Sequence, residues 1–111
     1  MQISIKTAGV DLTPSFKTYI EEKLLPLAKF VKAFDEAGGA EIRLEISRMA
    51  KHRKGDVFWV AADLRLPKQV LRAEAESSDG RAAVDVIKDK LRSEIEKYRT
   101  RVLEPKRTEK Q

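Results

Sequence analysis

The chain has 111 residues, with 23 lysines and arginines against 18 aspartates and glutamates, one histidine and no cysteine. This length suits a single domain with one core. The lack of cysteine excludes disulfides, thiolate metal sites and a thiol nucleophile, and one histidine is too few for a histidine-rich metal site. No apolar run approaches the roughly 18 residues of a membrane-spanning helix, and the N-terminus lacks the apolar stretch of a signal peptide. We therefore expect a soluble cytoplasmic domain with no cofactor, no metal and no membrane partner.

The predicted elements begin with a short strand and a helix. Residues 2–6 alternate polar and apolar side chains, as a half-buried strand does. Thr13 and Pro14 then match a helix N-cap and first helical position. Apolar residues follow at spacings of three and four up to Phe34, which predicts one apolar helix face. Pro26 interrupts this face and predicts a kink or break, because proline lacks the N–H that a helix interior needs.

Three strands and a second helix follow. Alternating side chains predict strands over residues 41–48, 57–66 and 70–76. The intervening residues 49–56 read as a basic loop that is long for a hairpin. Residues 77–80 are a helix-start signal for the final helix. The core stripe of this helix is expected to be Val84, Ile87, Leu91, Ile95, Tyr98 and Val102.

The order β-α-β-β-β-α predicts an α+β fold. A four-stranded, mostly antiparallel sheet with both helices packed on one face lets every apolar stripe meet another. We expect one domain over residues 1–103. Pro105 stops the last helix, and residues 104–111 are expected to form a basic, disordered tail.

The positive charge is concentrated in the 48–54 segment and in the last helix and tail. Residues 97–111 hold six basic and two acidic residues. Helical periodicity places the basic residues of the last helix on two flanks of its apolar stripe. One flank holds Arg81, Lys88, Arg92 and Arg99, and the other holds Lys90, Lys97 and Arg101. Such a surface suits the phosphates of folded RNA, although long cations also serve simply to cover apolar surface.

Catalysis finds little support in the residue pattern. His52 lies in the basic loop, where a phosphate contact or a solvated side chain is the commoner role. Asp85 and Asp89 are one helical turn apart on a face expected to be solvated, and a Mg²⁺ site there would need further oxygen ligands. Trp59 lies on the outer face of the predicted sheet, where it either packs or stacks on a base. We therefore expect no enzymatic activity and no small-molecule substrate.

Several segments follow a known order and spacing. They are Met1–Ile5, Leu12–Pro14, Tyr19–Leu24, and Ala73–Glu76 leading to Arg81–Leu91. Over residues 1 to about 101 the chain resembles the short ribosome hibernation promoting factors, the family that includes the ribosome-associated inhibitor A proteins. The resemblance implies the β-α-β-β-β-α fold and a non-enzymatic translation factor made under starvation or stress. Such proteins bind the small ribosomal subunit in its mRNA and tRNA channel, which blocks translation and preserves idle ribosomes.

Carried over position by position, the resemblance implies contacts with ribosomal RNA by a set of basic residues on the two helices. They are Lys23, Lys90, Lys97, Arg99 and Arg101. Charge placement adds Arg53, Lys54, Arg81 and Arg92. The implied partners are the small subunit and the intact ribosome, and we expect a monomer away from the ribosome. Long members of the family carry a C-terminal domain that pairs two ribosomes, so we do not expect this chain to pair ribosomes alone.

The chain departs from the family pattern at three positions, and two other functions stay open. Arg81 stands where the family usually has an aromatic residue, Ser93 stands where it usually has a basic one, and Pro26 is unexpected in the first helix. One alternative is a general module for structured RNA, similar to a double-stranded RNA-binding domain, although such a module normally opens with a helix. The other is a protein-interaction domain that uses the outer sheet face around Trp59.

Overall fold

The computed structural model describes residues 1–34, 39–51 and 55–103. The predictions for His52, Arg53, Lys54 and the 104–111 tail lie outside the described residues.

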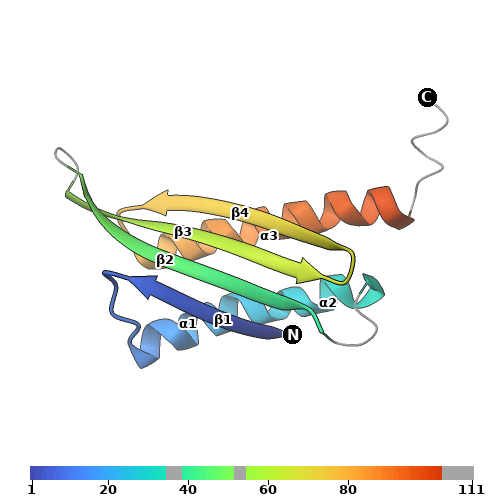
Figure 1. Ribbon diagram of the computed structural model, residues 1–111, viewed down its shortest axis with the longest axis horizontal. Coiled ribbons are helices and arrows are strands. Elements are labelled where there is room, and N and C mark those ends of the chain that lie inside the picture. Colours follow the sequence, from blue (N-terminus) through green and yellow to red (C-terminus); the bar gives the residue numbers. More distant parts are fainter. Residues whose placement is uncertain (35–38, 52–54, 104–111) are drawn as a thin grey trace.

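Four strands form one sheet in the order of the chain (Figure 1). They are β1 (Gln2–Ala8), β2 (Glu41–Lys51), β3 (Gly55–Leu66) and β4 (Gln69–Ser77). β1 runs parallel to β2, whereas β2–β3 and β3–β4 are antiparallel. The helical segment between β1 and β2 crosses back along the sheet, which is the connection that a parallel pair requires. The predicted α+β fold with a mostly antiparallel sheet is confirmed.

The hairpin between β2 and β3 is longer than predicted. Met49 pairs with Val57 and Ala50 with Asp56, so much of the expected 49–56 loop is strand, and the prediction is wrong there. Across the ladder, the Arg48 guanidinium donates from Nε to Asp56 Oδ2 at 2.8 Å. This ion pair and the backbone ladder extend the strands past the point where the apolar alternation ends.

The first predicted helix is divided at Pro26. Helix α1 (Pro14–Leu24) begins as expected, with Thr13 Oγ1 accepting a hydrogen bond from the Phe16 N–H at 3.2 Å. The chain then forms a 3-10 turn, η1 (Leu25–Leu27), before it resumes as α2 (Ala28–Val31) and η2 (Lys32–Phe34). The missing N–H of Pro26 explains the tighter turn, because it cannot close the helical hydrogen bond to the preceding turn.

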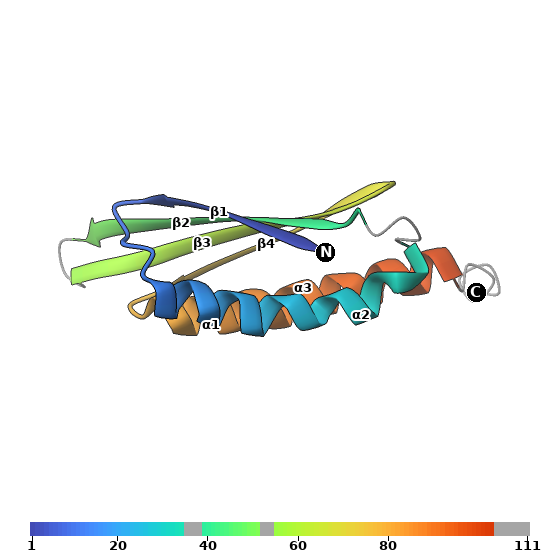
Figure 2. The ribbon, with the colours of Figure 1, turned by 90° about the horizontal axis from the view of Figure 1, so that it is seen from below.

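The last helix, α3 (Gly80–Leu103), is continuous over 24 residues. Asp79 caps it, with its Oδ1 accepting from the Arg81 N–H at 3.0 Å. Figure 2 shows both helical segments side by side under one face of the sheet. No helix within the described ranges is long and apolar enough to cross a membrane.

The core lies between the sheet and the helices. The predicted stripes supply its largest fully buried side chains, among them Ile20, Leu24, Ile42, Leu44, Ile87, Leu91 and Ile95. The Phe34 and Tyr98 rings pack at 4.9 Å between centroids and close one end of the core. Val102 was predicted to continue the stripe, but its side chain is 46% exposed, so that prediction is wrong. The last turn of α3 extends past the end of the sheet, so none of the described strands covers this position (Figure 2).

Candidate nucleic-acid interface

The first basic flank of α3 borders α1 and α2. The guanidinium carbon of Arg81 lies 5.0 Å from the centre of the Tyr19 ring, and that of Arg92 lies 4.6 Å from the centre of the Phe30 ring. From α1, Lys23 Nζ lies 5.4 Å from the same Tyr19 ring. Packing of the helices therefore brings Lys23, Arg81 and Arg92 into one row along the seam between them. We call these three residues the interhelical row.

The second flank borders β4 at the edge of the sheet. Lys90 Nζ donates a hydrogen bond to the backbone oxygen of Glu74 at 2.6 Å. Lys97 Nζ lies 3.3 Å from Glu94 Oε2 on the same helix. Both lysines line a surface hollow of about 460 Å³ between α3 and β4. Lys90 and Lys97 thus form a second group, which we call the sheet-edge row.

Two more predicted contacts lie near the end of α3. Arg99 and Arg101 are exposed, and the guanidinium carbon of Arg101 lies 5.9 Å from the centre of the Tyr98 ring. The seven described candidates therefore lie in the helix layer but do not form one cluster. They fall into the interhelical row, the sheet-edge row and the C-terminal turns of α3.

The cations of the helix layer contact mainly aromatic rings. Tyr19, Phe30 and Tyr98 each lie under at least one lysine or arginine. A ring attracts a cation through its quadrupole but carries no net charge to cancel it. The few ion pairs here, such as Lys97 with Glu94, are exposed and weak. The helix layer therefore keeps its positive charge available to an anionic partner.

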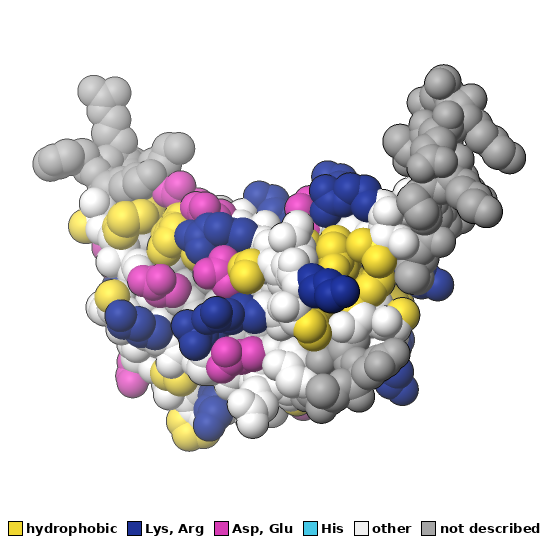
Figure 3. Space-filling model, turned by 45° about the vertical axis from the view of Figure 1, so that its right-hand side comes forward, with side chains coloured by type: hydrophobic (Ala, Val, Ile, Leu, Met, Phe, Trp, Pro, Cys, Tyr) yellow, Lys and Arg dark blue, Asp and Glu magenta, His cyan; other side chains and the backbone are white. Residues whose placement is uncertain are grey.

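The outer face of the sheet has a different electrostatic character. Lysine and arginine side chains alternate there with aspartate and glutamate, as Figure 3 shows in an oblique view. Arg72 donates to Asp63 at 2.9 Å and to Glu74 at 3.2 Å, and these hydrogen bonds raise the pKa of the Arg72 guanidinium. Arg43 donates to Glu41 at 3.2 Å. Because Arg43 and Arg72 are paired with carboxylates, this part of the face offers little net positive charge.

Trp59 lies on the outer face, as predicted. Its side chain is half-buried, and its neighbours along the strand on the same face, Val57 and Ala61, are buried. Packing therefore accounts for part of its surface. A role in base stacking or in binding a protein stays a prediction.

The sequence did not predict the contact between Tyr19 and Asp85. Asp85 was expected on a solvated face, and its side chain is 48% exposed, but its Oδ1 also accepts a hydrogen bond from the Tyr19 hydroxyl at 2.7 Å, which was not predicted. The same oxygen lies 3.8 Å from Lys23 Nζ. The helical spacing of residues in α3 defines two flanks, but it does not show which of them packs against α1. A sequence signal did exist within α1, where Tyr19 and Lys23 are one turn apart and so lie on the same side.

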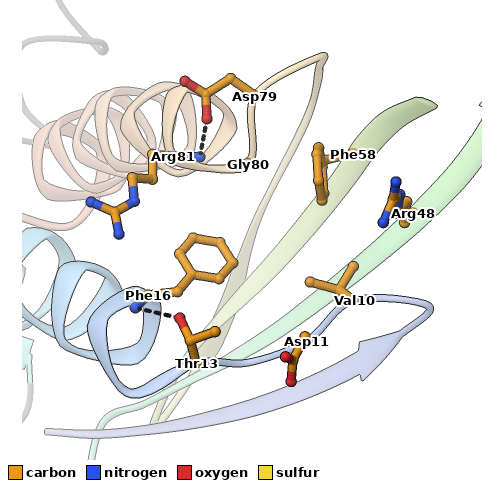
Figure 4. Close-up of a pocket in the computed structure, with 9 residues that line it drawn as sticks. All are labelled: Val10, Asp11, Thr13, Phe16, Arg48, Phe58, Asp79, Gly80 and Arg81. Carbon is orange, nitrogen blue, oxygen red and sulfur yellow. Dashed lines mark hydrogen bonds between the residues drawn. The ribbon is translucent and has the colours of Figure 1, made fainter. Parts of the chain in front are cut away.

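A hollow of about 340 Å³ opens where the starts of α1 and α3 meet the sheet (Figure 4). Its lining carries both signs of charge, with Asp11 and Asp79 beside Arg48 and Arg81. The Arg81 guanidinium points away from Arg48 and toward α1 in this view. Side-chain caps already engage the amides at the start of both helices. The hollow is therefore less suited to an anion than the interhelical row.

Comparison with known proteins agrees with this architecture. The family model described as Sigma 54 modulation protein / S30EA ribosomal protein matches residues 3–103. The chain belongs to this family. Among S30EA relatives, a ribosome hibernation promoting factor of Pseudomonas putida is 27% identical over 99 residues, which cover 89% of this chain and 87% of the relative.

A ribosome hibernation promotion factor of Deinococcus radiodurans is 28% identical over 104 residues, or 93% of this chain. The chain spans only about half of that longer relative, 52% of its length. Among solved structures, a ribosomal subunit interface protein from Coxiella burnetii matches with a TM-score of 0.70 at 25% identity, covering 90% of this chain and 99% of that one. The S30EA fold thus extends over nearly all the described residues.

Proposed function

We propose that this S30EA family protein is a ribosome-binding hibernation factor. It binds the small ribosomal subunit in the mRNA and tRNA channel under stress or starvation, which blocks tRNA and mRNA binding and preserves idle ribosomes. It acts in the bacterial cytoplasm, catalyses no reaction, and is a monomer away from the ribosome. The observation that carries the proposal is the family match over residues 3–103, and relatives named as hibernation factors support it.

The helix layer is the proposed contact surface for ribosomal RNA. Its cations lie on both helices and face rings more than carboxylates. Each lysine or arginine that meets a phosphate releases counterions, which adds affinity without reading sequence. The proposed contacts are Lys23, Arg53, Lys54, Arg81, Lys90, Arg92, Lys97, Arg99 and Arg101. Residues 1–103 form the binding domain in this proposal, and 104–111 is a basic tail.

The mechanism needs only occlusion. A folded domain that fills the channel excludes tRNA and mRNA by its volume, and electrostatic attraction keeps it there. This mechanism predicts strongly salt-dependent binding that initiator tRNA reverses.

Matched charge reversals on the two faces test the proposal. We would measure co-sedimentation with purified small subunits at several salt concentrations. Lys90→Glu, Lys97→Glu and Arg101→Glu together should weaken binding by more than about tenfold and reduce the salt dependence by about three ions. The control, Lys6→Glu, Arg43→Glu and Arg65→Glu, changes the net charge equally on β1, β2 and β3, and should leave most of the affinity.

Other results point to the alternatives. Equal losses in both triple variants would mean that only net charge matters and that the helix layer is not the contact surface. Equal affinity for free duplex RNA and for subunits would favour a general RNA-binding module. Affinity that responds to Trp59→Ala and hardly to salt would favour a protein-interaction domain.

A further inference from the structure

Four side chains from the two helices meet at one point of the seam. The Tyr19 ring has Lys23 Nζ at 5.4 Å and the guanidinium carbon of Arg81 at 5.0 Å from its centre. Its hydroxyl donates to Asp85 Oδ1 at 2.7 Å. Tyr19 is therefore the common partner of two cations and one carboxylate. Arg81 also contacts Ser15, with 3.4 Å between Nη2 and Oγ, which ties the start of α3 to α1.

The shared ring brings one cation from each helix to the same place. Two cations that both lie within about 6 Å of one ring are close enough to engage a single stretch of phosphate backbone. The surface beside them is open, since Ser15, Thr18 and Arg81 line a shallow hollow of about 350 Å³ next to Tyr19, whose lining also includes the acidic side chain of Glu22. Guanidinium and hydroxyl groups are suitable donors to phosphate oxygens.

Asp85 competes with a phosphate for the ammonium group of Lys23. The two charged groups are 3.8 Å apart, and the Lys23 side chain is 39% exposed, so their attraction is weak. The shorter contact of Asp85 is with Tyr19, not with Lys23. The tyrosine hydroxyl therefore satisfies the carboxylate by a charge-assisted hydrogen bond and leaves Lys23 available.

We propose that Lys23 and Arg81 form one phosphate-binding pair for an RNA backbone across the ring of Tyr19. We also propose that Tyr19 is a positioning residue for this pair, because it occupies Asp85 and so keeps Lys23 available to phosphate. This inference rests on the proposed function, and it adds a site that draws on both helices and a role for two residues without positive charge.

Two isosteric substitutions and their combination test the role of Tyr19. Tyr19→Phe keeps the ring and removes only the hydroxyl, so Asp85 should turn to Lys23 and weaken binding to small subunits by up to about fivefold. Asp85→Asn removes the competing charge and should tighten binding by a similar factor. If Tyr19 acts through Asp85, Tyr19→Phe should have almost no effect in the Asp85→Asn background.

Controls separate this inference from general charge effects and from loss of folding. Asp89→Asn removes the same charge one turn further along α3, at an exposed position, and should tighten binding much less. Equal gains from Asp85→Asn and Asp89→Asn would overturn the inference, as would a full Tyr19→Phe effect in the Asp85→Asn background. Circular dichroism checks the fold of each variant. Failure of the unmodified protein to bind subunits would instead overturn the proposed function.

The phosphate-binding pair needs its own double-mutant test. Lys23→Gln and Arg81→Gln should each weaken binding and reduce the salt dependence by about one ion. If the two cations engage one stretch of backbone, their effects on affinity should be coupled and less than additive. Strictly additive effects, or no effect from either variant, would overturn the pair.

Discussion

The two faces of this molecule use their basic residues in opposite ways. On the outer face of the sheet, Arg43 and Arg72 form hydrogen bonds with carboxylates of the same sheet. In the helix layer, Arg81 and Arg92 lie over the rings of Tyr19 and Phe30. A carboxylate cancels the charge of its partner, whereas a ring orients a cation and leaves its charge in place.

This difference explains how a chain with a modest net charge of +5 can present a strongly basic surface. What matters is which groups lie next to each cation, more than how many cations there are. An aromatic ring under an arginine also restricts its side chain, so less entropy is lost when the guanidinium meets a phosphate.

The largest effect is a loss of stability when a cavity is created in the core between the sheet and the helices. Leu91 is fully buried between α3 and the sheet. Leu91→Ala should lower the free energy of unfolding by about 2–5 kcal/mol, because it removes buried apolar surface and leaves a cavity. Urea denaturation measures it. Val102→Ala, on the same stripe but exposed, is the control and should change stability by less than about 0.5 kcal/mol. Similar losses in the two variants would contradict this account of the core.

The next largest effect is on binding to small subunits, and it is tested by replacing one arginine on each face. Arg92→Glu should weaken binding to small subunits by roughly tenfold, because it places a carboxylate in the interhelical row. Arg72→Glu makes the same change of charge on β4, where Asp63 and Glu74 already lie beside the guanidinium, and should weaken binding by less than about threefold. Titration of labelled protein with subunits at fixed salt measures both. A larger loss from Arg72→Glu would reverse the assignment of the two faces.

Much of this architecture follows from periodicity in the sequence. Strand alternation and the two apolar stripes predict which side chains face the core, and Thr13 and Asp79 mark the starts of the helices. These features are local, because each depends on residues within one element. The length of the β2–β3 hairpin was missed, since the pairing of Ala50 with Asp56 depends on the opposite strand and not on apolar alternation.

The candidate site was harder to predict because it forms between elements. The sequence places Arg81 and Lys90 on different flanks of α3, but it cannot show that one flank meets α1 and the other meets β4. The contact of Asp85 with Tyr19 joins residues 66 positions apart. Such a contact depends on how two helices pack together. The pattern of residues within each helix does not show that packing.

A smaller effect concerns the stability that the paired outer face contributes. Arg72→Ala removes two exposed ion pairs and should lower the free energy of unfolding by about 0.2–1 kcal/mol at low salt. The loss should shrink in about 1 M NaCl, because salt screens exposed charges. Thermal unfolding at both salt concentrations measures it. Arg65→Ala, on the adjacent strand, serves as the control for removing an exposed arginine. A loss that does not change with salt would point to packing of the Arg72 side chain and away from its charge.

The smallest effect is confined to alkaline pH and tests the contact at the centre of the seam. The hydrogen bond to Asp85 raises the pKa of Tyr19 above its usual value of 10.0, and partial burial and the charge of Asp85 act in the same direction. The folded protein therefore keeps this proton at a pH where the unfolded chain has lost it. The resulting stability is fully present below pH 10.0 and is lost as the pH rises through the folded pKa.

Absorbance of tyrosinate measures this pKa directly once Tyr19 is the only tyrosine. The chain has two tyrosines, so Tyr98→Phe provides that background. The midpoint should lie above 10.0, and Asp85→Asn should move it back toward 10.0 because the carboxylate that favours the proton is gone. Asp89→Asn should leave the midpoint nearly unchanged, which distinguishes a direct contact from the general field of α3. An identical midpoint with and without the Asp85 carboxylate would show that Tyr19 and Asp85 do not interact in solution, and the contacts of the described residues would then leave Lys23 as the partner of Asp85 across this part of the seam.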